Sequence, residues 1–149
     1  MRYIIPESIV TEHEELHEEL VKLAKGSGRS GEQAKTVANL LHPHFVKEEE
    51  FALPPLGLLG AVAVGRVTPE MAGVLPMTDK LKAEIQQMLQ EHKAIVAVLE
   101  DMAEAAKKKE KMEYVHFAEK LILHAHSEEE ILYPASLLVG EYIRLKLKK

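Results

Sequence analysis

The sequence repeats itself at an offset of 80 residues. Residues 37–60 (VANLLHPHFVKEEEFALPPLGLLG) align with residues 117–140 (FAEKLILHAHSEEEILYPASLLVG), and nine of these 24 positions are identical. A second match, one residue out of step, aligns TEHEEL at 11–16 with QEHKAI at 90–95. Two amphipathic helices can share leucine and alanine by chance. A shared histidine, glutamate triplet and proline at one fixed offset indicates a duplicated unit.

Apolar residues recur at helical spacing along the chain, and strand signals are almost absent. Turn and break signals, such as GSGRSG at 26–31 and Pro54-Pro55, separate the helical segments. The expected helices are 7–25, 32–53, 78–106 and 113–133, with short helical pieces between the second and third, and a last helix that restarts at Pro134. This order predicts an all-α fold, an antiparallel up-down four-helix bundle with a short helical connection between helices 2 and 3 and an extra C-terminal helix.

The length of 149 residues suits one domain with a buried core. We expect a single domain, 1–149, built from two similar helical hairpins, about 7–60 and 79–140. The net charge of −5 argues against a nucleic-acid partner. The N-terminus has no apolar signal core, and the longest apolar run, 56–65, is too short to span a bilayer. We therefore expect a cytoplasmic protein with no membrane partner.

The absence of cysteine excludes disulfides, thiolate zinc sites and cysteine-ligated iron–sulfur clusters. Histidine, with eight residues, is unusually frequent. Each half carries a His-x-x-x-Glu motif late in its second helix. Residues four apart share a helix face, so His44 points with Glu48, and His124 with Glu128. Residues two apart differ by about 200°, so His126 points away from that face.

The predicted turns bring these side chains to one level. In an antiparallel hairpin, residues equidistant from the turn lie side by side. The midpoint of His13 and His44 falls within 26–31, and the midpoint of His92 and His124 falls in the lysine run at 107–109. The midpoint of position 46 and His92 is 69, in the connection. One layer therefore holds His13, His44, Glu48, His92, His124 and Glu128.

Six inward ligands are too many for one structural zinc ion, which takes four. Imidazole and carboxylate groups suit two iron or manganese ions bridged by the carboxylates. Without a metal these buried groups would be costly, so ion binding would also remove an energetic problem.

These residues resemble the hemerythrin family, in particular the bacterial and archaeal hemerythrin-like HHE cation-binding domains. The resemblance covers about residues 7–142. It rests on Glu12-His13, His44-x-x-x-Glu48 followed by Pro54, Glu91-His92, and His124-x-x-x-Glu128 followed by Leu-Tyr-Pro134.

The resemblance implies a non-haem di-iron centre inside the bundle, for which manganese or zinc could substitute. Histidines would be terminal ligands, and Glu48 and Glu128 bridges. An oxo or hydroxo bridge and an open position for O2, NO or peroxide would complete the site. Oxygen-carrying hemerythrins have a further histidine one turn along the third helix, where this chain has Val96. This departure leaves one iron short of a protein ligand and argues against simple reversible O2 carriage.

We therefore expect a di-iron protein that binds or reacts with O2, NO or peroxide in sensing, storage or a stress response. The sequence identifies neither a substrate pocket nor an acid or base at the open position, which favours a carrier or sensor over an enzyme. A di-iron site could still turn over NO or peroxide. The sequence leaves the protein partner open, and also the choice between monomer and homodimer.

Two other functions fit parts of the sequence. One is a non-redox regulatory module with zinc or no metal, which the fold alone does not exclude. The other is a ferritin-like di-iron carboxylate bundle, whose mark is Glu-x-x-His on two helices. Glu14-x-x-His17 and Glu113-x-x-His116 match that string, but they do not superpose in the repeat and leave His44, His92 and His124 unexplained.

Several other polar residues lie near the motifs. His17, one turn from His13, is a candidate for a hydrogen bond to a bridging carboxylate or for a further ligand, although a satisfied core histidine is the commoner role. Tyr133 is expected to pack rather than to guard the site. The residues expected to lie outside the site are His42, His116, His126, Glu49, Glu50, Glu129 and Glu130.

Overall fold

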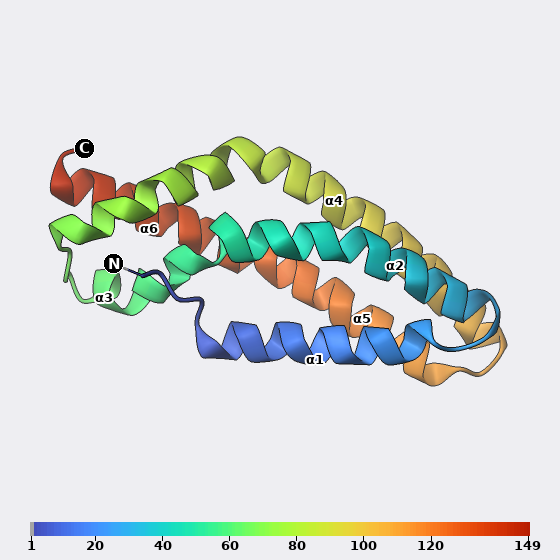
Figure 1. Ribbon diagram of the computed structural model, residues 1–149. Helices are drawn as coiled ribbons and strands as arrows, with labels where there is room; N and C mark the ends of the chain where they lie inside the picture. Colours follow the sequence, from blue (N-terminus) through green and yellow to red (C-terminus); the bar gives the residue numbers. More distant parts are fainter. Residues whose placement is uncertain (1) are drawn as a thin grey trace.

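The computed structural model describes residues 2–149 and shows four long helices along a common axis (Figure 1). They are α1 (Glu7–Ala24), α2 (Gly28–Lys47), α4 (Leu75–Lys108) and α5 (Met112–Ser127). Successive long helices run in opposite directions, with the α1–α2 and α4–α5 turns at one end of the bundle. No strand occurs in the described residues. The prediction of an all-α up-down bundle is confirmed.

The first turn is tighter than the sequence predicted. Helix α2 begins at Gly28, four residues before the expected start at Glu32. Gly28 has φ +77°, a left-handed conformation that glycine adopts at no steric cost. The chain reverses direction within residues 25–27, and Gly28 begins the helix. The last residues of GSGRSG therefore belong to α2.

The connection between the hairpins consists of short helical pieces, as predicted. Helix α2 passes directly into a π-helical turn, η1 (Glu48–Ala52), and Pro54 then opens the 3-10 helix η2 (Pro54–Leu58). A short α3 (Leu59–Ala63) and a second 3-10 helix, η3 (Pro69–Val74), lead to α4. Proline lacks the amide proton that a continuing α-helix needs, so the chain turns away from the bundle axis at Pro54.

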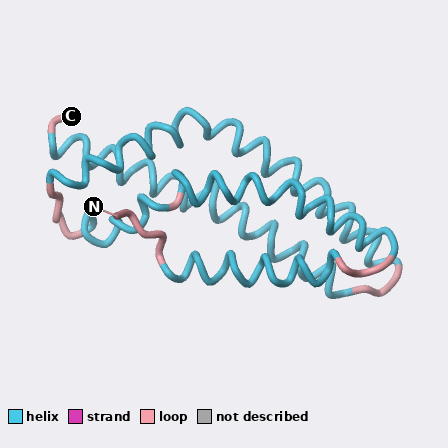
Figure 2. The backbone as a smooth tube through the Cα atoms, viewed as in Figure 1, coloured by secondary structure: helices cyan, strands magenta, loops and turns pink. Residues whose placement is uncertain are grey.

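The expected break at Pro134 is wrong. Helix α5 continues through a second π-helical turn, η4 (Glu128–Leu132), into α6 (Tyr133–Leu147), and the backbone stays helical throughout (Figure 2). Pro134 is the second residue of α6, directly after the π turn. The predicted C-terminal helix is therefore the continuation of the fourth long helix. It packs closely against α4, because a Cβ at Gly140 would overlap the side chain of Thr78.

Two apolar clusters enclose a polar layer. One fills the bundle toward the α1–α2 turn and includes Leu20, Leu99 and Phe117. The other lies at and beyond the π turns and includes Phe51 and Met88. The predicted metal-ligand layer lies between them along all four helices. Among residues 2–149, no helix has the length and apolar character that crossing a membrane requires.

Candidate metal centre

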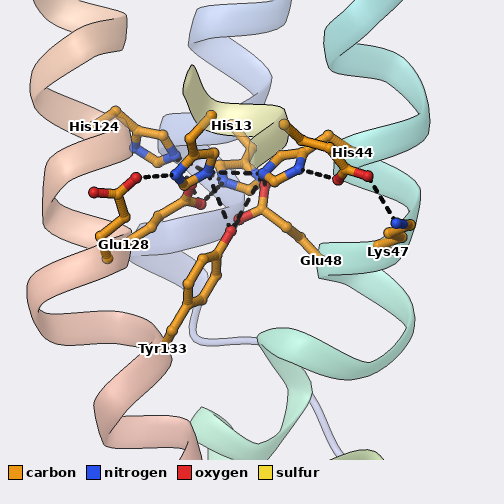
Figure 3. A network of polar contacts seen from close by, with 10 residues as sticks. His13, His44, Lys47, Glu48, His124, Glu128 and Tyr133 are labelled. Atoms are coloured by element: carbon orange, nitrogen blue, oxygen red, sulfur yellow. Dashed lines mark hydrogen bonds and ion pairs between the residues drawn. The ribbon is translucent and has the colours of Figure 1, made fainter. Parts of the chain in front are cut away.

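The six residues predicted to form the layer are all buried, none with more than 7% of its residue surface exposed. Each of the four long helices supplies a histidine, and the two glutamates open the π turns. Figure 3 shows the labelled members of this set converging inside the bundle. Metal-ligand geometry then separates the histidines into two pairs.

The first group joins α1 to α5. The Nε2 atoms of His13 and His124 are 3.1 Å apart. Glu128 Oε2 lies 3.1 Å from His124 Nε2 and 3.4 Å from His13 Nε2. Three ligand atoms, one from each side chain, lie close enough together to hold one metal ion.

The second group joins α2 to α4. The Nε2 atoms of His44 and His92 are 2.8 Å apart, and Glu128 Oε1 lies 3.2 Å from His92 Nε2. These three residues also form a group that could hold a metal ion. Glu128 therefore belongs to both groups and turns a different oxygen toward each.

Three further glutamates hold the outer ring nitrogens. Glu91 Oε1 is 2.8 Å from His44 Nδ1, Glu129 Oε1 is 2.9 Å from His92 Nδ1, and Glu12 contacts His124 Nδ1. A carboxylate in this position accepts the Nδ1 proton and leaves Nε2 with a free lone pair. Glu12 and Glu91 come from the repeated Glu-His pairs, and each reaches a histidine in the other half of the chain.

This donor set fits a cation. His44 and His92 both use their Nδ1 protons on carboxylates, so their Nε2 lone pairs face each other across 2.8 Å. A proton or a metal ion between them removes that repulsion. In addition, Glu48 Oε1 is buried and has no hydrogen-bond partner within residues 2–149. A buried oxygen without a partner is costly, and a metal ion would satisfy it.

Glu48 is placed differently from Glu128. Its Oε1 lies 3.6 Å from His44 Nε2, and it is a member of neither three-residue group. Its other oxygen, Oε2, accepts a hydrogen bond of 2.9 Å from the Tyr133 hydroxyl. That hydroxyl also lies 3.2 Å from His44 Nε2 and 3.3 Å from His92 Nε2. Figure 3 shows the Tyr133 side chain pointing its hydroxyl into the centre.

The expectation that Tyr133 only packs is therefore wrong. In a regular α-helix, residues five apart differ by about 140°, which would direct Tyr133 away from Glu128. The π turn needs about one extra residue for each rotation, so Tyr133 returns to the face of Glu128. Its backbone N–H accordingly donates to the Glu128 carbonyl, five residues earlier. Glu129, expected outside the site, is also half-buried against His92.

The two central carboxyl groups have opposite proton affinities. Burial and the adjacent Glu128 charge raise the pKa of Glu48 well above its usual range. Burial also acts to raise the pKa of Glu128, but hydrogen bonds with Glu48, His124, His13 and His92 outweigh it and hold that pKa well below its usual range. These opposite shifts favour the negative charge of the pair on Glu128.

Burial acts to lower the pKa of three central histidines, but its weight against hydrogen bonds differs among them. It lowers the pKa of His44 and outweighs the bond to Glu91. Burial acts in the same direction on His92 and His124, but their bonds to Glu128 and to an outer carboxylate raise their pKa values overall. The Glu128 carboxylate is thus the largest cause that raises the pKa of both His92 and His124.

The remaining candidates lie at the surface or beside the site. Val96, where oxygen-carrying hemerythrins have a further histidine, is half-buried. His17 is exposed, and within residues 2–149 it makes no hydrogen bond or ion pair with a central carboxylate. The exposed residues include both ferritin-like strings and the other histidines: Glu14, His17, Glu113, His116, His42 and His126. The structure therefore gives no support to a ferritin-like carboxylate site.

Comparison with known proteins agrees with this geometry. The family model of the hemerythrin HHE cation-binding domain matches residues 5–136, which is most of the chain and includes all six central side chains. Neither the curated proteins nor the solved structures contain a match. The family match covers the entire histidine and glutamate layer, and the chain belongs to the hemerythrin HHE cation-binding domain family.

Proposed function

We propose that this protein binds two iron ions, one held by His13 and His124 and the other by His44 and His92. The observation that carries the proposal is the position of Glu128, whose two carboxylate oxygens face the two histidine pairs separately. A single-ion site would not need one carboxylate between two complete pairs. Glu48, whose buried Oε1 lacks a partner, is proposed as the second carboxylate ligand.

Two iron ions at this position would supply redox chemistry toward O2, NO or peroxide. Two histidines and a shared carboxylate for each ion leave coordination positions free, as at reactive metal sites. Tyr133 holds Glu48 through its hydroxyl and places a hydrogen-bond donor at the centre. His44, Glu48 and Tyr133 are each at most 1% exposed, so only a small ligand can reach them.

We infer a role in sensing, storage or a stress response, with the small ligand bound or converted at the centre. Because the centre is closed to larger molecules, an enzyme acting on an organic substrate is not part of this proposal. Turnover of NO or peroxide remains compatible with it.

Metal content and the optical spectrum of the purified protein test the proposal. Two irons per chain, with oxo-to-iron charge-transfer bands in the near ultraviolet, are expected. One zinc per chain without such bands would instead identify a non-redox module. Rapid mixing of the reduced protein with O2, NO and peroxide then separates the roles, since a stable adduct indicates binding or sensing and repeated turnover indicates an enzyme.

A further inference from the structure

A groove of about 560 Å³ lies between α1 and α2 and reaches the centre at one residue, His13. Its polar lining consists of exposed carboxylates and imidazoles, which are Glu14, Glu18, Glu49, His17 and His42. Among the described residues that line it, none is a lysine or arginine. Three carboxylates at one groove attract divalent cations and repel anions.

His13 is the one central histidine whose ring is not anchored on its outer side. Carboxylates hold Nδ1 of the other three rings, whereas His13 Nδ1 has no hydrogen-bond partner within residues 2–149. The side chain is nevertheless more than nine-tenths buried and lines the groove. Its ring stacks on Phe45, with centroids 4.4 Å apart and planes within 10°. A stack has no directional bond that would fix the ring.

The repeat shows where the missing anchor would be. Glu129 anchors His92, and the equivalent residue in the first half is Glu49. Glu49 lines the same groove as His13 but makes no hydrogen bond to it within the described chain. One acidic side chain is thus available at the groove, beside a histidine whose outer nitrogen has no carboxylate partner within the described chain.

The other sides of the centre are more firmly closed. At α2 and α4, Lys47 bonds to Glu91 at 2.8 Å, and Glu91 in turn holds His44. A smaller groove of about 200 Å³ between α1 and α5 reaches His124, but there Glu12 already occupies the outer ring nitrogen. Outward rotation would cost His124 this bond to Glu12 in addition to its inner contacts, whereas His13 would lose inner contacts alone.

We propose that metal ions reach the centre through the α1–α2 groove and that His13 swings between groove and centre to carry each ion inward. Glu14, Glu18 and Glu49 concentrate the divalent cation, and His17 and His42 give it transient nitrogen contacts. This inference rests on the proposed metal-binding function but concerns the rate of loading rather than the final affinity.

Stopped-flow uptake of Co²⁺, followed by its visible absorption bands, tests the groove. The triple variant E14Q/E18Q/E49Q should load about tenfold more slowly, because cation attraction is lost, while the final metal content stays unchanged. The matched control is E100Q/E104Q/E119Q, which makes the same charge change at exposed positions away from the groove. It should load at nearly the wild-type rate. Equal slowing in both variants would show a general charge effect and overturn the proposal.

Two blocking variants identify the route. Val46→Trp fills the α1–α2 groove, and Ser8→Trp fills the smaller groove between α1 and α5; both positions are exposed. Slow loading in Val46→Trp alone supports the proposal. Slow loading in Ser8→Trp alone, or no slowing in either variant, overturns it.

The proposed movement of the His13 side chain can be measured separately, in the metal-free protein. Imidazole nitrogen NMR should show exchange broadening for His13 and sharp signals for His92, which Glu129 holds. Equally sharp signals from both rings would exclude the swing. If the wild-type protein takes up no metal at all, the proposed function itself fails. If it loads normally and the groove variants match it, only the loading route fails.

Discussion

The two halves of the chain use the same backbone device and then diverge. In each half a π turn begins at the motif glutamate, Glu48 or Glu128, and its last backbone bond joins residues five apart. After the first turn the chain breaks into a 3-10 helix, whereas after the second it continues as α6. The π turn is therefore not a prelude to a helix break. What the two π turns share is that each begins at the glutamate that faces the layer.

The difference between the halves lies in the residues that follow. Tyr133 and Leu53 are equivalent in the repeat, but only Tyr133 brings a hydroxyl to the centre, and Leu53 joins the apolar cluster. Likewise Glu129 anchors a histidine, whereas Glu49 faces the groove. The ligands and the Glu-His supports are duplicated, but the contacts of Tyr133 and Glu129 have no counterpart in the first half. One side of the centre is therefore held more firmly than the other.

The largest effect should come from the shared glutamate. Glu128→Gln replaces one of the two carboxylate oxygens by an amide group and removes the negative charge that both histidine pairs face. We expect metal affinity to fall more than about 100-fold, since even outer partners of ligands contribute 10–100-fold. Glu48→Gln, the equivalent change in the other half, should keep both groups intact and retain at least one ion. Metal per chain after reconstitution and dialysis measures the difference.

His126→Ala serves as the control for that comparison, because its side chain is exposed two residues from His124. It should retain full metal content. If Glu128→Gln and Glu48→Gln lose the same amount of metal, the two glutamates are equivalent bridges. The structural asymmetry of the centre would then have no effect on metal affinity.

Helix angles and turn positions were sufficient to predict the inward residues. The i, i+4 rule paired His44 with Glu48 and His124 with Glu128, and it correctly directed His126 outward. The turn midpoints gave the common level, because antiparallel helices fix their register at the connecting turn. The structure brings these side chains together in the predicted layer, although their role as ligands remains a proposal.

The supports could not be predicted because they depend on departures from regular helix geometry and on contacts between halves. Tyr133 faces inward only because of a π turn, which the 3.6-residue period does not contain. Glu12 and Glu91 reach histidines 112 and 47 residues away in sequence. The repeated Glu-His pairs were a usable signal for them, since both glutamates were duplicated along with the ligands.

The next largest effect on metal affinity should come from the glutamates that hold the outer ring nitrogens. Glu129→Gln weakens the hold on His92 Nδ1, and metal affinity should fall about 10- to 100-fold. The equivalent Glu49→Gln should leave equilibrium affinity unchanged, because Glu49 makes no hydrogen bond to His13 within the described chain. Competition with a chelator of known affinity measures both. A loss of the same size in Glu49→Gln would mean that Glu49 anchors His13 once metal is bound.

Tyr133→Phe should act mainly on stability. It deprives Glu48 Oε2 of its donor, and a buried acceptor left unsatisfied costs about 1–3 kcal/mol of unfolding free energy. Tyr114→Phe is the matched control, since its buried hydroxyl donates to the Leu23 carbonyl far from the centre. Denaturant unfolding of both should show a loss, but only Tyr133→Phe should also change the rate of reaction with peroxide or NO. Unaltered reaction rates would restrict Tyr133 to packing.

The smallest effect tests whether proline maintains the π turns. Pro134 and Pro54 each follow a π turn by the same number of residues, but Pro134 is exposed within a continuous helix and Pro54 is buried where the helix breaks. Pro134→Ala should therefore change the unfolding free energy by no more than about 0.5 kcal/mol and leave metal content intact. Pro54→Ala should cost more, because it frees the unfolded chain and removes buried contacts. Loss of metal in Pro134→Ala would show that a regular α-helix replaces η4 once an amide proton is available, which would turn Tyr133 away from the centre.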